Sequence, residues 1–267
     1  MKIRNRYTNA IIFENDSDTM RTTVILAISA KVSLVSAYLE NVNLIGANLQ
    51  GADLRNADLR GANFHKADLH GAILRDIDAE RANLKEVNLY NADLHCADLE
   101  EANLIGANLI GANLQSINLE GAKLQNTDLR EANLENADLE LANLQRANLY
   151  RANLWNAILW CTNLHEANLH KADIRNTDFQ NANLQHANFR NTKGDSQEII
   201  TFQINYYTIT ITKDIFQIGH ESHSIKEWKE FTDKEILAMD GKDALDFWKI
   251  YKSVLFEIHD LNFKLNK

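Results

Sequence analysis

The residues of this chain whose types and spacing could do chemistry are above all carboxylates that recur at a fixed interval. Glutamate recurs at a 20-residue interval or its double, at Glu40, Glu80, Glu100, Glu120 and Glu140. If this interval corresponds to one coil of the chain, these side chains stack in a row and create a strong negative potential. Such a row would attract a cationic surface. The acidic residues predicted to share this side are Asp58, Asp78, Glu80, Asp98, Glu100, Glu101, Glu120, Asp138 and Glu140.

The charge of this acidic side is closer to that of a nucleic acid than to that of a nucleic-acid-binding protein. The chain carries a net charge of −9, which disfavours direct binding to DNA, RNA or an anionic membrane. On the acidic side the only predicted bases are Arg60 and Arg81. For coils spaced by about 4.8 Å, the side carries one net charge per roughly 2.7 Å, against one per about 1.7 Å in duplex DNA. The side either mimics DNA charge to capture a DNA-handling protein or is a solvated face inherited from duplicated 20-residue units.

A second candidate surface is apolar. Leu141, Trp155, Ile158 and Trp160 fall at outward positions of neighbouring coils. Contiguous exposed aromatic side chains are typical of contact surfaces. Three occupants are open: the C-terminal segment of the chain folded back on the coils, which we favour, a partner protein, or a second copy of the chain.

The sequence gives weak signals for a metal. His165 could neighbour His186 on successive coils, and His220 and His223 flank Glu221. Neither group offers the three or four ligands that a metal site needs, so we predict no metal.

Thiol and catalytic signals are weak as well. The two cysteines, Cys96 and Cys161, fall on different sides of the coil and are predicted to be free thiols in a reducing compartment. The apolar run Val24–Ser29 is short for a membrane span or a signal peptide. Phosphate-loop, zinc-protease and nucleophile-elbow motifs are absent from the sequence. We therefore predict a cytoplasmic, non-catalytic protein without cofactors.

The element that positions these side chains is an internal repeat. From Leu34 to Phe189 every fifth residue is Leu, Ile or Phe, except Ala79. The residue two places earlier is nearly always Ala, and mostly Asn or Asp stands between the two. Five residues advance an α-helix by about 500°, so the leucines would form no stripe. On a flat strand an odd period sends alternate leucines to opposite faces. A short extended piece followed by a bend, once per five residues, keeps every Ala and Leu inside and stacks into a solenoid.

Stretches such as residues 102–106 and 132–136, which read ANLIG and ANLEN, resemble the pentapeptide-repeat family. The resemblance covers about 160 of the 267 residues. It implies an all-β solenoid, a right-handed quadrilateral β-helix with four pentapeptides per coil and about eight coils, in which the central Leu and the preceding Ala point inward. Some pentapeptide proteins bind DNA gyrase and protect it from quinolones by mimicking DNA, so a gyrase-like target is one expectation. The resemblance is imperfect there, because the repeats carry no projecting loop.

Two flanking segments differ from the repeat, which divides the chain into 1–31, 32–192 and 193–267. The first reads as a cap, with strand-like runs Ile3–Thr8 and Ala10–Glu14 and a helix, N-capped by Ser17 or Asp18, that continues through Ala30. The last reads as a small α+β unit that covers the C-terminal end of the coils. Its predicted elements are strands Ile199–Tyr207, Thr208–Thr212 and Ile215–Ile218, two capping boxes at 224–227 and 232–235, and a helix from Asp243 to about His259. These flanks are similar to those of some phage- and prophage-encoded bacterial members.

The sequence therefore favours a non-catalytic protein-interaction module that presents the acidic side to a protein partner, with a monomer favoured and no direct contact with nucleic acid or membrane. The alternative is a structural rod or spacer that presents the C-terminal unit to its partner. The chain also contains no proline, which indicates a backbone whose N–H groups are nearly all engaged.

Overall fold

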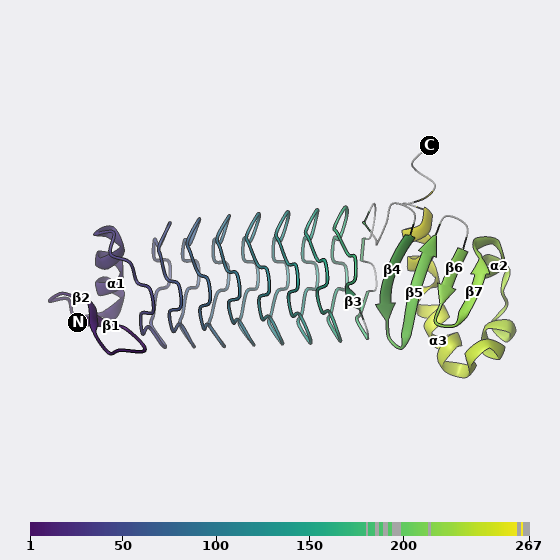
Figure 1. Ribbon diagram of the computed structural model, residues 1–267, viewed down its shortest axis with the longest axis horizontal. Helices are drawn as coiled ribbons and strands as arrows, with labels where there is room; N and C mark the ends of the chain where they lie inside the picture. The colour runs from purple at the N-terminus through teal and green to yellow at the C-terminus, as the bar shows by residue number, and fades with distance from the viewer. Residues whose placement is uncertain are drawn as a thin grey trace.

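A computed structural model shows an elongated molecule with a distinct unit at each end of a stack of coils (Figure 1). The structure describes residues 1–179, 181–184, 187–188, 192–193, 199–212, 215–260 and 263. Phe189 and His186 lie outside the described residues.

Each coil of the stack is a 20-residue unit. Parallel bridges join residues 20 apart, from Tyr38 with Asp58 to Asp173 with Lys193. They are isolated bridges rather than long strands, because each side of the coil is extended for only one or two residues before it turns. Four pentapeptides therefore make one four-sided coil, as the 20-residue interval of the glutamates predicts.

The pentapeptide 103–107 shows why the repeat has this composition. The Asn103 side chain accepts a hydrogen bond from the N–H of Ile105 at 3.2 Å, and the N–H of Ala107 donates to the carbonyl of Leu104 at 2.9 Å. Gly106, the last residue of the turn, has a φ of 67°. Asn and Asp before the central Leu thus provide a side-chain acceptor that closes the bend.

All five N–H groups of this pentapeptide donate. Besides those of Ile105 and Ala107, the N–H groups of Asn103, Leu104 and Gly106 donate to carbonyls of adjacent coils at 3.0, 2.7 and 3.0 Å. Proline at any of the five positions would remove a donor. The absence of proline is therefore a consequence of this hydrogen-bond pattern.

The interior of the stack is filled by the Ala and Leu positions, which are buried throughout the described coils. Phe64 and Phe179 are the largest fully buried side chains among the central residues. Thr127, one of the threonines that replace Ala, donates its hydroxyl to the carbonyl of Leu104 at 2.9 Å. A buried hydroxyl is tolerated because it finds this backbone acceptor.

The N-terminal unit consists of strand β1 (Lys2–Arg4), strand β2 (Ile11–Glu14) and helix α1 (Met20–Ser29). The predicted hairpin and helix are present, but both predicted N-caps are wrong. Thr19 caps α1, since its side chain accepts from the N–H of Thr22, while the hydroxyl of Ser17 contacts that of Thr23 at 2.7 Å.

The C-terminal unit is a sheet backed by helices (Figure 1). Its strands are β4 (Ile199–Ile204), β5 (Tyr207–Thr212), β6 (Ile215–Ile218) and β7 (Glu221–Ser224), joined antiparallel in that order. The prediction for the first strand was too long, because Asn205, with a φ of 54°, begins a turn. Strand β7 was missed, since its polar sequence ESHS gives no strand signal.

Two helices follow the sheet, α2 (Ile225–Glu230) and α3 (Asp233–His259). Both predicted capping boxes are confirmed, with Ser224 and Thr232 as the N-caps. Helix α3 is broken at Asp240 and Gly241, whose backbone angles are not helical. Its second part coincides with the predicted helix that starts at Asp243. Among the described residues, no helix is both long enough and apolar enough to cross a membrane.

One side of the coil connects both end units. The N–H of Tyr38, on the first coil, donates to the carbonyl of Arg4 at 2.8 Å, which attaches β1 to the stack. On the last coil of the same side, β3 (Asp178–Phe179) pairs in parallel with β4. A single hydrogen-bonded ladder therefore runs from the hairpin through the coils into the C-terminal sheet, and both open edges of this side are paired.

Candidate interaction surface

The glutamates at the 20-residue interval lie along this same side of the molecule. We define the acidic ladder as Glu80, Glu100, Glu120 and Glu140. Each follows the central residue of its pentapeptide, and parallel bridges from Asp78 through Asp98 and Asn118 to Asp138 hold their coils in register. The four side chains are partly buried by one another and by their neighbours.

Mutual repulsion is visible in the titration of the ladder. Burial, followed by the negative charges of Glu120, Asp98, Glu80 and Glu101, raises the pKa of Glu100 above its ordinary value. Because the charged form is disfavoured in the folded protein, the ladder opposes folding at neutral pH.

The aspartates of this side have a structural role that the glutamates lack. Asp98 accepts hydrogen bonds from the N–H of Glu100 at 3.1 Å and from the side-chain amide of Asn118 at 3.0 Å. Asp138 accepts from the N–H of Glu140 at 3.0 Å. The fold therefore requires an acceptor at the aspartate positions, whereas no hydrogen bond of the described coils requires a glutamate after the central residue.

Arginines neutralise the N-terminal part of the acidic side. Arg60 binds both carboxylate oxygens of Asp58, at 2.9 and 2.6 Å, and lies 3.4 Å from Asp78. Asp58 is only 2% exposed; burial acts to raise its pKa, but the hydrogen bonds and charge of Arg60 hold that pKa below its ordinary value. Arg6 of the N-terminal unit adds a contact with Asp78 at 3.5 Å.

Arg81 has the same effect one coil further on. It lies 2.8 Å from Glu80 and 2.6 Å from Glu101. In the part of the chain that the structure describes, Glu100, Glu120 and Glu140 form no ion pair with Lys or Arg. The uncompensated charge of the predicted site is thus concentrated on these glutamates, with Asp98 and Asp138 beside them. The contribution of Arg6 could not be read from the sequence, because it depends on where the hairpin docks.

The predicted apolar surface is exposed. We define the apolar patch as Leu141, Trp155, Ile158 and Trp160, whose exposed fractions range from 38% for Trp160 to 54% for Leu141. No described part of the C-terminal segment folds back over it, so the occupant that we favoured is wrong. That unit packs on the end of the stack instead, where β4 continues the ladder and the hydroxyl of Tyr251 donates to the carbonyl of Ala182 at 3.2 Å.

The acidic ladder and the apolar patch are neighbours. Trp160 occupies the position of Glu140 on the next coil, and Ile158 bridges to Asp138. The N–H of Leu141 donates to the carbonyl of Trp160 at 2.9 Å. The two predicted surfaces therefore join into one, in which uncompensated carboxylates lead into exposed aromatic side chains.

The remaining candidates lie in the C-terminal unit. His220 and His223 both contact Glu221, at 3.5 and 3.0 Å. Tyr207 donates to Asp240 at 2.8 Å, and burial together with this carboxylate raises the pKa of Tyr207 to about 12. The cavity between them has a volume of about 20 Å³, which is room for about one water molecule and too little for a cofactor.

A four-sided coil with a filled interior and an outer surface of variable residues defines the class of β-helical solenoid proteins. Within this class the chain belongs to the pentapeptide-repeat family. The family model "Pentapeptide repeats" matches residues 37–76, 82–121, 117–156, 147–185 and 157–193, which together exceed half of the chain. Members of the family fold as right-handed quadrilateral β-helices, the predicted fold class, and are generally non-catalytic.

Solved structures with this fold include three that we compared in detail. HetL of Nostoc sp. strain PCC 7120, involved in heterocyst differentiation regulation, is 28% identical, with 64% of this chain and 93% of that chain covered and a TM-score of 0.38. QnrB1, a plasmid-mediated fluoroquinolone resistance protein, is 18% identical over 60% and 87%, with a TM-score of 0.43. Rfr23 of Cyanothece 51142 is 30% identical over 46% and 63%, with a TM-score of 0.23. No curated protein sequence matches the chain.

Proposed function

We propose that this protein is a non-catalytic protein-interaction module whose contact surface is the acidic ladder together with the apolar patch. The observation that carries the proposal is that Glu100, Glu120 and Glu140 are required by no hydrogen bond of the coil, carry uncompensated charge among the described residues, and adjoin exposed Trp160. A surface that opposes folding and serves no structural purpose is expected where binding needs it.

The partner that fits this surface is a protein with a basic groove, such as a DNA-handling protein. Carboxylates stacked about every 4.8 Å compare with one phosphate per about 3.4 Å along one strand of duplex DNA. The apolar patch adds affinity that a phosphate backbone does not offer. A gyrase-like enzyme is one such target.

Capture experiments with charge variants test the proposal. The ladder variant changes Glu80, Glu100, Glu120 and Glu140 to Gln. The control variant removes four other negative charges by changing Glu14, Glu86, Glu131 and Glu166 to Gln; these residues form ion pairs with Lys or Arg. We expect the ladder variant to lose a partner that the control variant retains, and duplex DNA and added salt to release that partner from the unchanged protein.

Equal capture by both variants, or a partner that duplex DNA does not displace, would refute DNA mimicry. The gyrase case is tested by a supercoiling assay at micromolar protein concentration. Neither inhibition nor protection from a quinolone would remove gyrase as the target.

A rod that presents the C-terminal unit is the second candidate function. The observation in its favour is the ladder that continues from the last coil through β3 into β4, since this pairing fixes the unit rigidly on the stack. In this case the ladder variant keeps its partner, and substitutions on the C-terminal sheet abolish capture.

The organisation that we propose for either function is a cap at 1–31, a β-helix at 32–192 and a C-terminal unit at 193–267, acting as a monomer in the cytoplasm. The free thiols of Cys96 and Cys161 support a reducing compartment. Limited proteolysis tests the boundaries, and light scattering tests the oligomeric state.

A further inference from the structure

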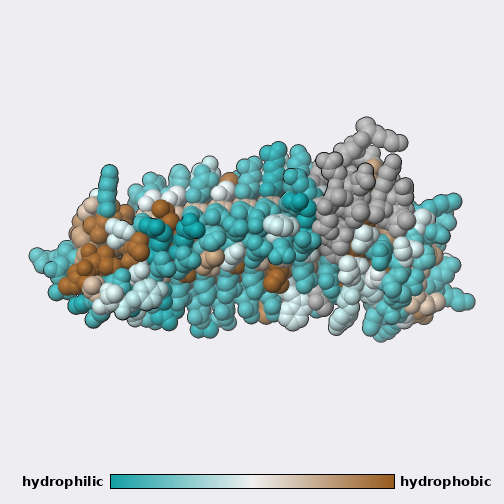
Figure 2. Space-filling model, viewed as in Figure 1, coloured by the Kyte–Doolittle hydropathy of each residue, from teal (hydrophilic) through white to brown (hydrophobic). Residues whose placement is uncertain are grey.

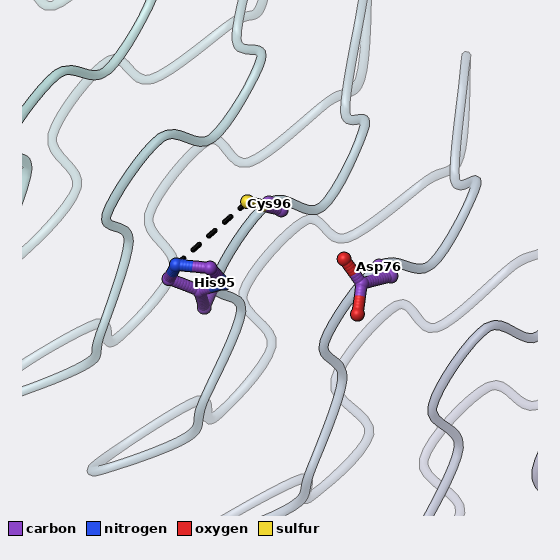
Figure 3. Close-up of side chains that lie close together, drawn as sticks. All are labelled: Asp76, His95 and Cys96. Carbon is purple, nitrogen blue, oxygen red and sulfur yellow. Dashed lines mark hydrogen bonds between the residues drawn. The ribbon is translucent and has the colours of Figure 1, made fainter.

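Three side chains of metal-binding type converge at one corner of the coil, remote from the acidic ladder. Asp76, His95 and Cys96 have ligand atoms that all lie within 4.8 Å of one another. The Nε2 atom of His95 is 3.7 Å from the Sγ atom of Cys96, and the carboxylate of Asp76 lies beside them on the preceding coil (Figure 3).

The backbone fixes this arrangement. Asp76 and Cys96 occupy the same turn position on successive coils, with φ angles of 57° and 55°, so their side chains leave the backbone side by side. The N–H of Asp76 donates to the carbonyl of His95 at 3.0 Å, which ties the two turns together. Because the Nδ1 atom of His95 is buried, Nε2 is the ring nitrogen that faces Cys96.

The observed spacing matches a tetrahedral metal ion. With Zn–S and Zn–N bonds of about 2.3 and 2.1 Å, a tetrahedral ion holds its sulfur and nitrogen ligands about 3.6 Å apart. The Asp76 oxygen can reach a third ligand position by side-chain rotation, since Asp76 is exposed and forms no ion pair among the described residues. The neighbouring Arg75 is directed to Asp93, at 3.8 Å.

We propose that Asp76, His95 and Cys96 form a binding site for one divalent transition-metal ion of the Zn²⁺ class, with a fourth position open to water or to a partner. A thiolate and an imidazole select a borderline-soft ion over Mg²⁺ or Ca²⁺. On binding, Cys96 forms a sulfur–metal bond and releases its thiol proton to solvent, and neutral His95 donates the lone pair of Nε2. The ion crosslinks two coils at this corner.

The test is a Co²⁺ titration of the full chain, purified without a histidine tag, stripped with chelator and kept reduced. We expect one equivalent of Co²⁺ to produce a thiolate-to-cobalt charge-transfer absorption that Zn²⁺ abolishes. Cys96→Ser should eliminate this absorption. Asp76→Asn and His95→Gln should each weaken Zn²⁺ binding at least about tenfold, the loss caused by changes even outside the ligand shell.

The chain contains a matched control. Cys161 occupies the same turn position on another side, with a φ of 54°, but it follows Trp160 and stacks on Leu141, so no comparable ligands flank it among the described residues. Cys161→Ser should leave the absorption unchanged. Ser116 and Asn56 already occupy the positions of Cys96 and Asp76 on adjacent coils, so the Ser and Asn variants are compatible with the fold. Absence of the charge-transfer absorption, or its loss on Cys161→Ser, would overturn the proposal.

Discussion

At the scale of single residues, the five positions of the repeat divide into three that the fold dictates and two that it leaves open. Ala and Leu fill the interior, and Asn or Asp closes the bend. The two turn residues accept Glu, Arg, Trp or Cys, although the second has a positive φ. The chemistry of the surface is therefore written almost entirely at the turns.

Glu100 provides a test of the repulsion within the acidic ladder. Its pKa is raised in the folded protein, so the folded state binds this proton more tightly than the unfolded state does. The resulting destabilisation is present at neutral pH and disappears as the pH falls through the raised pKa. We expect Glu100→Gln to raise the urea midpoint at pH 7 and to have no effect near pH 4, below the ordinary Glu pKa of about 4.3.

Glu135→Gln is the control for this experiment. Glu135 accepts a hydrogen bond from Gln115 at 3.1 Å and stacks on no other acid. It should therefore show no stabilisation at pH 7. A Glu100 effect that persists at low pH would contradict an electrostatic origin.

At the scale of elements, the break in α3 depends on one glycine. Gly241 has φ 68° and ψ −155°, a region that only glycine adopts readily. An added Cβ would meet no atom within 4 Å, so Gly241→Ala isolates backbone strain from packing. We expect it to destabilise the C-terminal unit by about 1–3 kcal/mol, measured by chemical denaturation.

Gly71 is the comparison for Gly241. It has a φ of 62° and open space around it, but its region is the left-handed one that Asn91 adopts on the next coil with a φ of 51°. Gly71→Asn should change stability by less than about 0.5 kcal/mol. Equal losses at both sites would show that the two conformations are equally strained.

The C-terminal unit protects an edge of the β-helix. Removing residues 193–267 takes β4 away from β3 and uncovers Phe179, which is fully buried in the complete chain. An unpaired parallel edge recruits other chains, so we expect this truncation to associate, as seen by light scattering. Tyr251→Phe removes only the hydrogen bond to Ala182 and should stay monodisperse. A truncated protein that remains a monomer would contradict the protective role.

At the scale of the whole molecule, the space-filling view shows hydrophilic residues over most of the visible length of the stack, with apolar residues gathered at the N-terminal end (Figure 2). Since each coil contacts mainly its neighbours, stability is expected to add coil by coil. The length of the molecule and the phase of its surface are then separate properties.

Inserting a second copy of residues 97–116 tests this additivity. The insertion adds one full coil, so every downstream side keeps its orientation and the acidic ladder gains one rung. We expect a folded protein about 4.8 Å longer, measured by small-angle scattering. Loss of cooperative unfolding would show that the coils are not interchangeable.

A five-residue insertion is the informative comparison. A second copy of residues 112–116 adds one side instead of four, which turns all downstream coils by a quarter turn. The ladder is then interrupted between Glu100 and Glu120. If the continuous ladder is the contact surface, partner capture should fall with the five-residue insertion and persist with the 20-residue one.

Much of this architecture could be predicted because one short pattern repeats without interruption. The period of five excludes an ordinary helix and strand, and the 20-residue recurrence of glutamate indicates four sides. The flanks were less predictable. Thr19 and Ser17 are equally good caps by residue type, and β7 is a strand only because β6 offers it a partner.

By itself, the sequence determined the coil, its filled interior and the positions of the outward side chains, because every backbone N–H of the pentapeptide is used and no proline could be accommodated. Only the tertiary structure decided which surface charges remain. Arg6 reaches Asp78 across 72 residues, and Asp76 meets Cys96 through the stacking of two coils. Such contacts depend on how segments distant in the chain are brought together, which local residue patterns do not encode.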